Sequence, residues 1–130
     1  MDYIKISEDS GADELEPIAR TVHSLVGLPT TIRSLNKKGI RMERSQIVDR
    51  EYTGPVLEEA LRTNKVIKTV PQEGIYKGKA VIVSPIRTED GKAIAALGIV
   101  DLVAALDILS AFDAYPGIIE EVEEAKKKMI

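Results

Sequence analysis

Residues 80–101, AVIVSPIRTEDGKAIAALGIVD, constrain the fold of this chain more than any other segment. Two apolar runs, residues 80–86 and 93–101, flank an Asp90-Gly91 pair. Asp-Gly favours a hairpin turn because glycine adopts a positive φ at no steric cost. The segment therefore predicts an antiparallel hairpin. Its second strand carries small residues where sheets usually place bulky ones, which predicts close approach of a helix or a ligand; these residues are Ala93, Ala95, Ala96 and Gly98.

Apolar spacing and turn-forming residues predict the elements before this hairpin. Helices are expected at residues 13–26 and 55–62, and strands at residues 30–35, 40–44 and 66–70. The buried stripe of the first helix is expected to run to its end and to include Leu15, Ile18, Ala19, Val22, Leu25 and Val26.

Turn residues and a proline add finer expectations. Gly39 is expected to take a left-handed conformation in a hairpin loop over residues 36–39. Pro85 cannot donate to a sheet ladder, so its strand is expected to be an edge or to carry a bulge there.

The spacing of apolar residues becomes helical after Asp101. A first helix is expected there, with an apolar stripe of Leu102, Ala105, Leu106, Leu109 and Phe112. Pro116-Gly117 ends it, and a final helix is expected from residue 118. The final helix carries Ile118, Val122, Ala125 and Met129 at coiled-coil spacing. Such a stripe packs either on its own domain, which is the commoner case, or in a homodimer formed through the flanking helices.

Short strands joined by tight turns favour antiparallel pairing, and helices covering one face of that sheet define an α+β protein. The chain has 130 residues, the size of one domain. We expect a single domain over residues 1–130. It comprises a loose arm (1–12), a core (28–101) and C-terminal helices (102–130).

Composition excludes several classes of function. The chain has no cysteine, so thiolate catalysis and thiolate metal sites are ruled out. His23 is the only histidine, which argues against a histidine-based metal site. A net charge of −3 argues against nucleic acid. The sequence has no signal-peptide pattern and no apolar run of the roughly 20 residues that span a bilayer, so we expect a cytoplasmic protein without a membrane partner.

Three short stretches carry a resemblance to sensory domains: Val83-Ser84-Pro85-Ile86, Asp90-Gly91-Lys92 and residues 96–101, ALGIVD. In these the chain resembles PAS-like and single-Cache-like domains. The resemblance implies a profilin-like antiparallel sheet of about five strands, with a ligand pocket between sheet and helices and dimerisation through flanking helices. The whole chain also resembles an uncharacterised family of small stand-alone proteins from methanogenic archaea, which implies no activity.

The sequence offers few candidate site residues, and each also has a structural interpretation. Arg33 and Arg41 could grip an anionic ligand, or belong to a solvated hairpin face. Ser84 and Tyr76 could present hydroxyls to a pocket, although ordinary surface positions are the favoured interpretation. Asp101 could bind a ligand amine, but an N-cap of the following helix is favoured. Ala96 and Gly98 would form the pocket wall.

These patterns favour a small-molecule-binding or sensory module without catalytic activity. No nucleophile or phosphate-binding motif is present, no metal ligands are indicated, and the sequence does not identify a cofactor. Two alternatives remain from other classes. One is a roadblock-like or longin-like dimeric scaffold, which shares the order of helices and strands and would have a filled core. The other is an enzyme with an unrecognised site.

Overall fold

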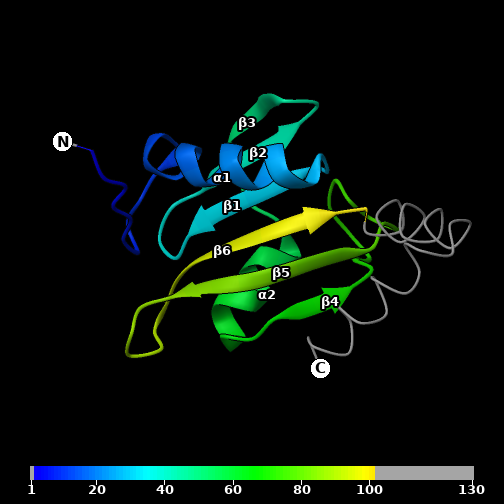
Figure 1. Cartoon of the computed structure of the whole chain (residues 1–130). Helices are drawn as coiled ribbons and strands as arrows, with labels where there is room; N and C mark the ends of the chain where they lie inside the picture. Colours follow the sequence, from blue (N-terminus) through cyan, green and yellow to red (C-terminus); the bar gives the residue numbers. More distant parts are fainter. Residues whose placement is uncertain (1, 102–130) are drawn as a thin grey trace, which may run out of the picture.

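The computed structural model describes residues 2–101, and this part of the chain folds into two helices and six strands (Figure 1). They are α1 (Ala12–Val26), β1 (Thr30–Ser34), β2 (Gly39–Glu43), β3 (Gln46–Tyr52), α2 (Pro55–Thr63), β4 (Ile67–Thr69), β5 (Val81–Arg87) and β6 (Ala93–Val100). The predicted C-terminal helices, with their coiled-coil spacing, lie outside the described residues.

The six strands form one open sheet in the order β3-β2-β1-β6-β5-β4, and all neighbours are antiparallel. The α+β class and the antiparallel pairing are confirmed. The sequence predicted about five strands, and the additional one is β3, at the edge beside β2.

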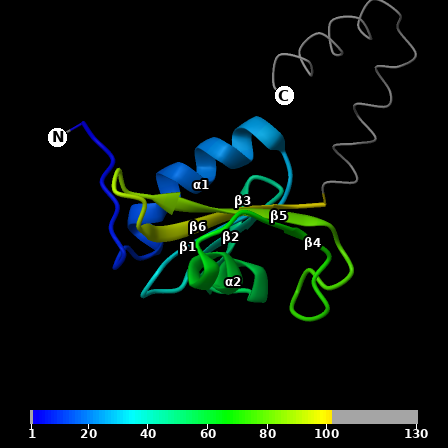
Figure 2. The same cartoon turned by 90° about the horizontal axis from the view of Figure 1, so that it is seen from below.

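The two helices pack on opposite faces of the sheet, so the prediction that helices cover one face was wrong (Figure 2). Side chains alternate between the faces of a strand. Ile32, Ile40 and Met42 therefore form one buried cluster with α1, while Val83, Ala96 and Val100 form another with α2. Each apolar face needs its own cover, which is why the core has two layers.

The hairpin of β5 and β6 is confirmed. Gly91 takes a φ of +91° in its turn, as an Asp-Gly turn requires. Pro85 lies beyond the pairing of β4 with β5, which ends at Val83, so β5 is an edge at the proline as predicted. Ala96 is fully buried in the cluster formed with α2, which confirms the close approach of a helix to the small-residue strand.

The sequence did not predict β3 because the turn before it lacks the usual turn residues. Arg44 and Ser45 connect β2 to β3 with φ of +52° and +65°, a conformation that normally favours Asn-Gly. His23 supports this turn from α1. Its Nε2 accepts a hydrogen bond from the Ser45 N–H at 2.9 Å, and its Nδ1–H donates to the Leu28 carbonyl at 2.8 Å.

Gly39 does not adopt the left-handed conformation that the sequence predicted, since its φ is not positive. The space around it explains the glycine instead. A Cβ atom at residue 39 would lie 1.9 Å from the carbonyl oxygen of Ile32. Close contact between β1 and β2 therefore requires glycine here.

Two further expectations at the α1 face differ from the structure. The apolar stripe of α1 is buried only at its start and middle, and Leu25 in the last turn is 81% exposed. Within the arm that precedes α1, the residues next to the helix contact the rest of the protein, whereas Tyr3 and Ile4 are exposed. Ser10 is fully buried, and the Glu8 carbonyl accepts a hydrogen bond from the Asn36 N–H at 2.9 Å.

Candidate functional site

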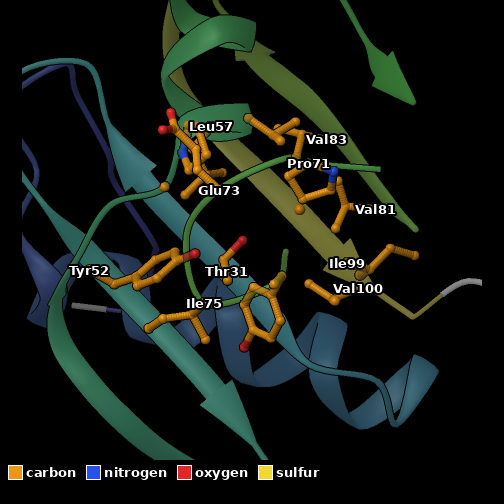
Figure 3. Close-up of a pocket in the computed structure, with 15 residues that line it drawn as sticks. Thr31, Tyr52, Leu57, Pro71, Glu73, Ile75, Val81, Val83, Ile99 and Val100 are labelled. Carbon is orange, nitrogen blue, oxygen red and sulfur yellow. The ribbon is translucent and has the colours of Figure 1, made fainter. Parts of the chain in front are cut away.

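A pocket lies on the α2 face of the sheet, between β1, β5 and β6, the first turn of α2 and the loop over residues 70–80 (Figure 3). Its volume is about 30 Å³. The side chains around it are mostly apolar; the lining residues are Thr31, Tyr52, Gly54, Pro55, Val56, Leu57, Pro71, Glu73, Ile75, Tyr76, Val81, Val83, Gly98, Ile99 and Val100.

Strand pairing builds the floor of the pocket. Gly98 is the direct partner of Thr31 on one side and of Val83 on the other, so the three residues lie in a row on the α2 face. A Cβ atom at Gly98 would lie 2.8 Å from Val83 Cγ2 and 3.0 Å from Thr31 Oγ1. The glycine therefore keeps the hollow open between these two side chains.

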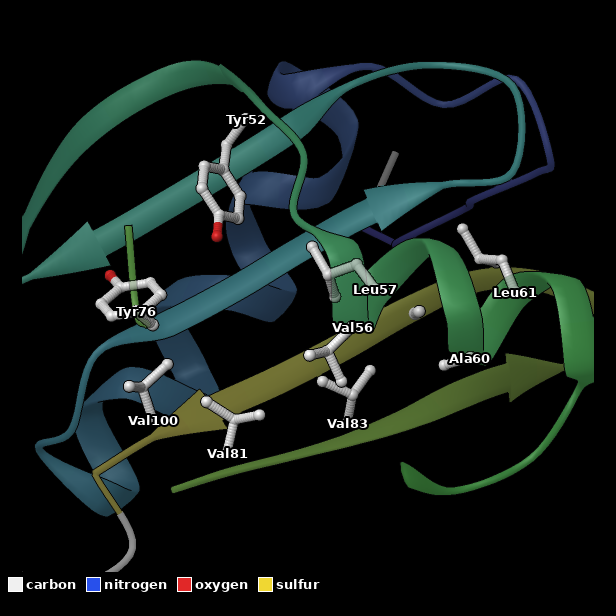
Figure 4. Packing of buried hydrophobic residues seen from close by; sticks show 10 residues of the cluster. Tyr52, Val56, Leu57, Ala60, Leu61, Tyr76, Val81, Val83 and Val100 are labelled. Carbon is white, nitrogen blue, oxygen red and sulfur yellow. The ribbon is translucent and has the colours of Figure 1, made fainter. Parts of the chain in front are cut away.

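Two tyrosines close the end of the pocket towards β2 (Figure 4). The rings of Tyr52 and Tyr76 meet edge to face, with their centroids 6.5 Å apart. The Tyr76 hydroxyl donates to Glu43 Oε2 at 2.7 Å, and Arg41 Nη1 donates to the same oxygen at 2.5 Å. The Arg41 guanidinium also lies over the Tyr52 ring, 5.9 Å from its centroid. These contacts attach the loop over residues 70–80 to the sheet.

Contacts within this cluster shift the pKa values of Glu43 and Tyr76. The hydrogen bond from Tyr76, together with that from Arg41, holds the pKa of Glu43 below its ordinary value. Burial raises the pKa of Tyr76, and the hydrogen bond to the Glu43 carboxylate raises it further. Tyr76 is therefore a neutral donor and Glu43 a charged acceptor at neutral pH.

Two residues at the pocket carry a hydroxyl group without a protein partner. Thr31 is 3% exposed and Tyr52 is 7% exposed. Within residues 2–101, neither the Thr31 hydroxyl nor the Tyr52 hydroxyl makes a hydrogen bond to another protein group. In residues 2–101, the buried side-chain polar atom without a partner is Arg41 Nε, so the hydroxyl oxygens of Thr31 and Tyr52 are not fully buried and water can reach them.

The structure brings only some of the predicted site residues to the pocket. Gly98 forms its floor, and Ala96 lies two residues earlier on the same face, against α2. Tyr76 lines the pocket and is 8% exposed, so the favoured interpretation as a surface residue was wrong. Arg41 joins the cluster of the two tyrosines through its hydrogen bond to Glu43 and through its contact with the Tyr52 ring.

Arg33 has a structural role on the same face of the sheet. Its Nε and Nη2 donate to the carbonyl oxygens of Ser34 and Leu35, at 2.8 and 3.0 Å. Its Nη1 donates to Thr53 Oγ1 at 2.8 Å. All three nitrogens are thus engaged with the segments that flank β1 and α2.

Ser84 and Asp101 do not line the pocket. Ser84 alternates with Val83 along β5, so its side chain lies on the opposite face of the sheet, where its hydroxyl donates to the Pro85 carbonyl. Asp101 follows β6 with a φ of +68°, whereas an N-cap residue is normally extended. The helix that it was expected to cap lies outside the described residues.

Sequence reasoning missed Thr31, Tyr52, Glu43 and the loop residues Pro71, Glu73 and Ile75. One signal pointed to the tyrosines: the chain has only four Tyr, one Phe and no Trp, and two of these few aromatics meet here. In the described part of the chain, no three His, Asp or Glu side chains gather into a potential metal site. Neither α1 nor α2 is long and apolar enough to cross a bilayer.

The fold and the site together define a small α+β protein with an open antiparallel sheet and a mostly apolar pocket roofed by a loop. The chain belongs to the family described as "Uncharacterized protein conserved in archaea (DUF2111)", whose model matches residues 22–103. It is similar to "Uncharacterized protein MJ0405" of Methanocaldococcus jannaschii, with 45% identity over 104 residues, 79% of each chain. The predicted resemblance to an archaeal family is thus confirmed. No solved structure matches the chain.

Proposed function

We propose that this protein is a small-molecule-binding module of the sensory type, without catalytic activity, whose ligand occupies the pocket beneath the loop over residues 70–80. The observation that carries the proposal is a pair of hydroxyls, those of Thr31 and Tyr52, that lie at a mostly apolar pocket without a protein partner. Ligand pockets typically combine an apolar lining with a few polar groups that orient the ligand.

Binding requires the loop to move. A volume of about 30 Å³ holds about one or two water molecules. The loop contains Gly74 and Gly78, both at positive φ, and Ile75 at its tip is 57% exposed. We infer that the loop opens around these glycines to admit a ligand and closes over it.

The charges near the pocket favour a neutral ligand with an apolar body and a hydrogen-bonding group. The guanidinium of Arg33 is engaged with Ser34, Leu35 and Thr53, and Arg41 is paired with Glu43. The anionic ligand suggested by the sequence would have to displace these contacts.

A PAS-like core belongs to the same proposal. It is supported by five antiparallel strands in the order β2-β1-β6-β5-β4, with a pocket between this sheet and α2. The edge strand β3 is an addition to that core.

Native mass spectrometry of gently purified full-length protein tests the proposal directly. A bound compound appears as extra mass that is lost when the chain is denatured. The expected result is such a mass, from a neutral and largely apolar compound.

Two neighbouring threonines provide a matched pair of variants, because they point to opposite faces of the same strand. Thr31→Val keeps the shape of the side chain and removes the hydroxyl at the pocket, so it should leave the melting temperature of the unbound protein nearly unchanged and reduce the bound mass. Thr30→Val removes a hydroxyl that donates to the Leu28 carbonyl at 2.9 Å. It should destabilise the protein by about 1 kcal/mol and leave the ratio of bound to unbound protein unchanged. Equal bound fractions in the two variants would contradict the pocket assignment.

The dimeric scaffold is the second candidate function, and the small size of the pocket favours it. The scaffold interpretation requires a nearly filled core and a sheet that continues into a second copy. β3 is a seven-residue edge strand that could pair in this way. A dimer in light scattering, without any bound mass, would support this candidate over the ligand-binding module.

A further inference from the structure

The sheet has one apolar region that neither described helix covers. We define the open face as Ile82, Ser84, Leu97 and Ile99, on the side of β5 and β6 away from α2. Ile82 is the direct partner of Ile99, and Ser84 is the partner of Leu97, so the four residues are contiguous. All four are only partly buried.

The position of the helices explains why this region is uncovered. α2 packs on the other face of β4, β5 and β6, whereas α1 lies over β1 and β2 (Figures 1 and 2). Leu97 reaches the cluster formed with α1, but Ile82 and Ile99 belong to neither buried cluster. Apolar surface continues from the open face to the end of α1. Leu25 and Val26 there are 81% and 40% exposed, and they precede Thr30, the partner of Ile99.

We propose that residues 102–113 of the same chain dock on the open face as an amphipathic helix. Three observations select this occupant: where the chain leaves the sheet, how long the segment is, and how its apolar residues are spaced.

The chain leaves the sheet at the open face itself. Asp101 follows Val100 at the end of β6, and its N–H donates to the Ala80 carbonyl at 2.8 Å. Its φ of +68° ends the extended conformation of the strand and turns the chain. The segment that follows therefore begins two residues after Ile99, at the border of the open face.

The length of the segment fits the face. A helix of twelve residues is about 18 Å long, at about 1.5 Å per residue. Strands lie about 4.8 Å apart, so such a helix is long enough to cover the two strands of the open face and to extend beyond them. Pro116-Gly117 ends the segment at a matching length.

The apolar residues of the segment are spaced as in a helix that buries one face. In a helix, the sequence spacing would place Leu102, Leu106 and Leu109 on one face with Ala105 and Phe112, and Asp107 on the other. Exposed alone, both the stripe and the open face would keep apolar surface in water, and docking removes both from solvent. A second copy could supply the same segment by reciprocal exchange, and the test below separates that case from docking within one chain. This inference does not depend on the proposed ligand.

The absence of cysteine makes the test clean, because engineered pairs have no native thiol to compete with. In the full chain, Ile82→Cys is combined with Leu106→Cys or with Leu109→Cys. The matched controls combine Ile82→Cys with Asp107→Cys or with Ala111→Cys, two positions on the opposite side of the helix. On mild oxidation, one of the stripe pairs should form an intramolecular disulfide at least tenfold faster than either control, since a disulfide requires Cα atoms within about 7 Å.

Two results would overturn the proposal: equal rates in all four pairs, or cross-links mainly between chains, which would identify a second copy as the occupant. Variants with a single cysteine provide a second test, which does not require the double-cysteine variants to fold. With Ile82→Cys alone, maleimide labelling should be several-fold slower than with Val48→Cys, an exposed position on β3. Adding Leu106→Glu and Leu109→Glu should remove that protection, while Asp107→Lys should not. Unchanged labelling in the glutamate variant would also refute the docking.

Discussion

At the scale of single residues, glycine is required at two positions of the sheet because neighbouring atoms occupy the space of a side chain. Gly39 faces the backbone of β1, where a Cβ atom would lie 1.9 Å from the Ile32 oxygen and 2.8 Å from Arg33 Cα. Gly98 faces side chains instead, with Val83 Cγ2 at 2.8 Å. A side chain can rotate away, whereas a paired backbone cannot.

We therefore expect Gly39→Ala to destabilise the protein more than Gly98→Ala. Overpacking typically costs about 1–3 kcal/mol, so Gly98→Ala should lie near the lower end and Gly39→Ala at or above the upper end. Gly98→Val should be intermediate, because its larger side chain fills the pocket. Urea denaturation of the three variants measures the free energies of unfolding. Similar losses for the two alanine variants would mean that β1 and β2 can separate at Gly39 without cost.

At the scale of the elements, the two-residue turn between β2 and β3 is the most strained connection in the described chain. Arg44 and Ser45 both have positive φ, which costs a residue with a Cβ atom about 1–2 kcal/mol. The contact of His23 with the Ser45 N–H compensates for part of this cost. The turn is thus held by α1 rather than by its own sequence.

Ser45→Gly should stabilise the protein by about 0.5–1 kcal/mol, because it relieves more backbone strain than it adds chain entropy in the unfolded state. Ser45→Ala is the matched control, since it also removes the hydroxyl but keeps a Cβ atom. It should leave the melting temperature unchanged or lower it. The two variants are compared by thermal denaturation, and an equal shift in both would show that the hydroxyl, not the backbone, matters here.

The same turn shows where sequence reasoning succeeded and where it could not. The hairpin of β5 and β6 was predictable because Asp90-Gly91 encodes its own turn. β3 was not, because the support of its turn comes from His23, more than twenty residues away. The opposite packing of α1 and α2 also depends on the register of β1 between β2 and β6, which local patterns do not specify.

Some residues of the candidate site could likewise be predicted from the sequence, and others could not. Gly98 was predictable from the small residues of its own strand. The role of Tyr76 depends on Glu43, which is distant in sequence and reaches it only after β2 and the loop have folded together. Arg33 and Arg41 were recognised as unusual, but their partners, Thr53 and Glu43, could be identified only in three dimensions.

At the scale of the whole molecule, Glu43 connects the two halves of the protein. Its carboxylate belongs to β2, on the half of the sheet under α1, and it holds Tyr76 of the loop that roofs the pocket on the α2 side. It also carries the ion pair with Arg41. The closed position of the loop therefore depends on the charge of a single side chain.

This dependence predicts how stability changes with pH. Folding lowers the pKa of Glu43 from its ordinary value of 4.5, through Tyr76 and then Arg41, so the folded state prefers the charged form. The stabilisation is complete above the ordinary pKa and is lost as the pH falls through the lowered pKa of the folded state. Glu43→Gln removes this contribution, so its urea midpoint should fall less than that of the wild type between about pH 7 and about pH 3.5.

Glu16→Gln is the matched control, because the pKa of Glu16 is also lowered, by Arg20 and Arg50, but at the surface of α1. Hydrogen exchange separates the two. After correction for the intrinsic pH dependence of exchange, acid should lower the protection of residues 70–80 in the wild type and in Glu16→Gln, whereas in Glu43→Gln these amides should already be less protected at neutral pH. If the loop amides respond to pH in the same way in all three proteins, then Glu43 does not hold the loop closed.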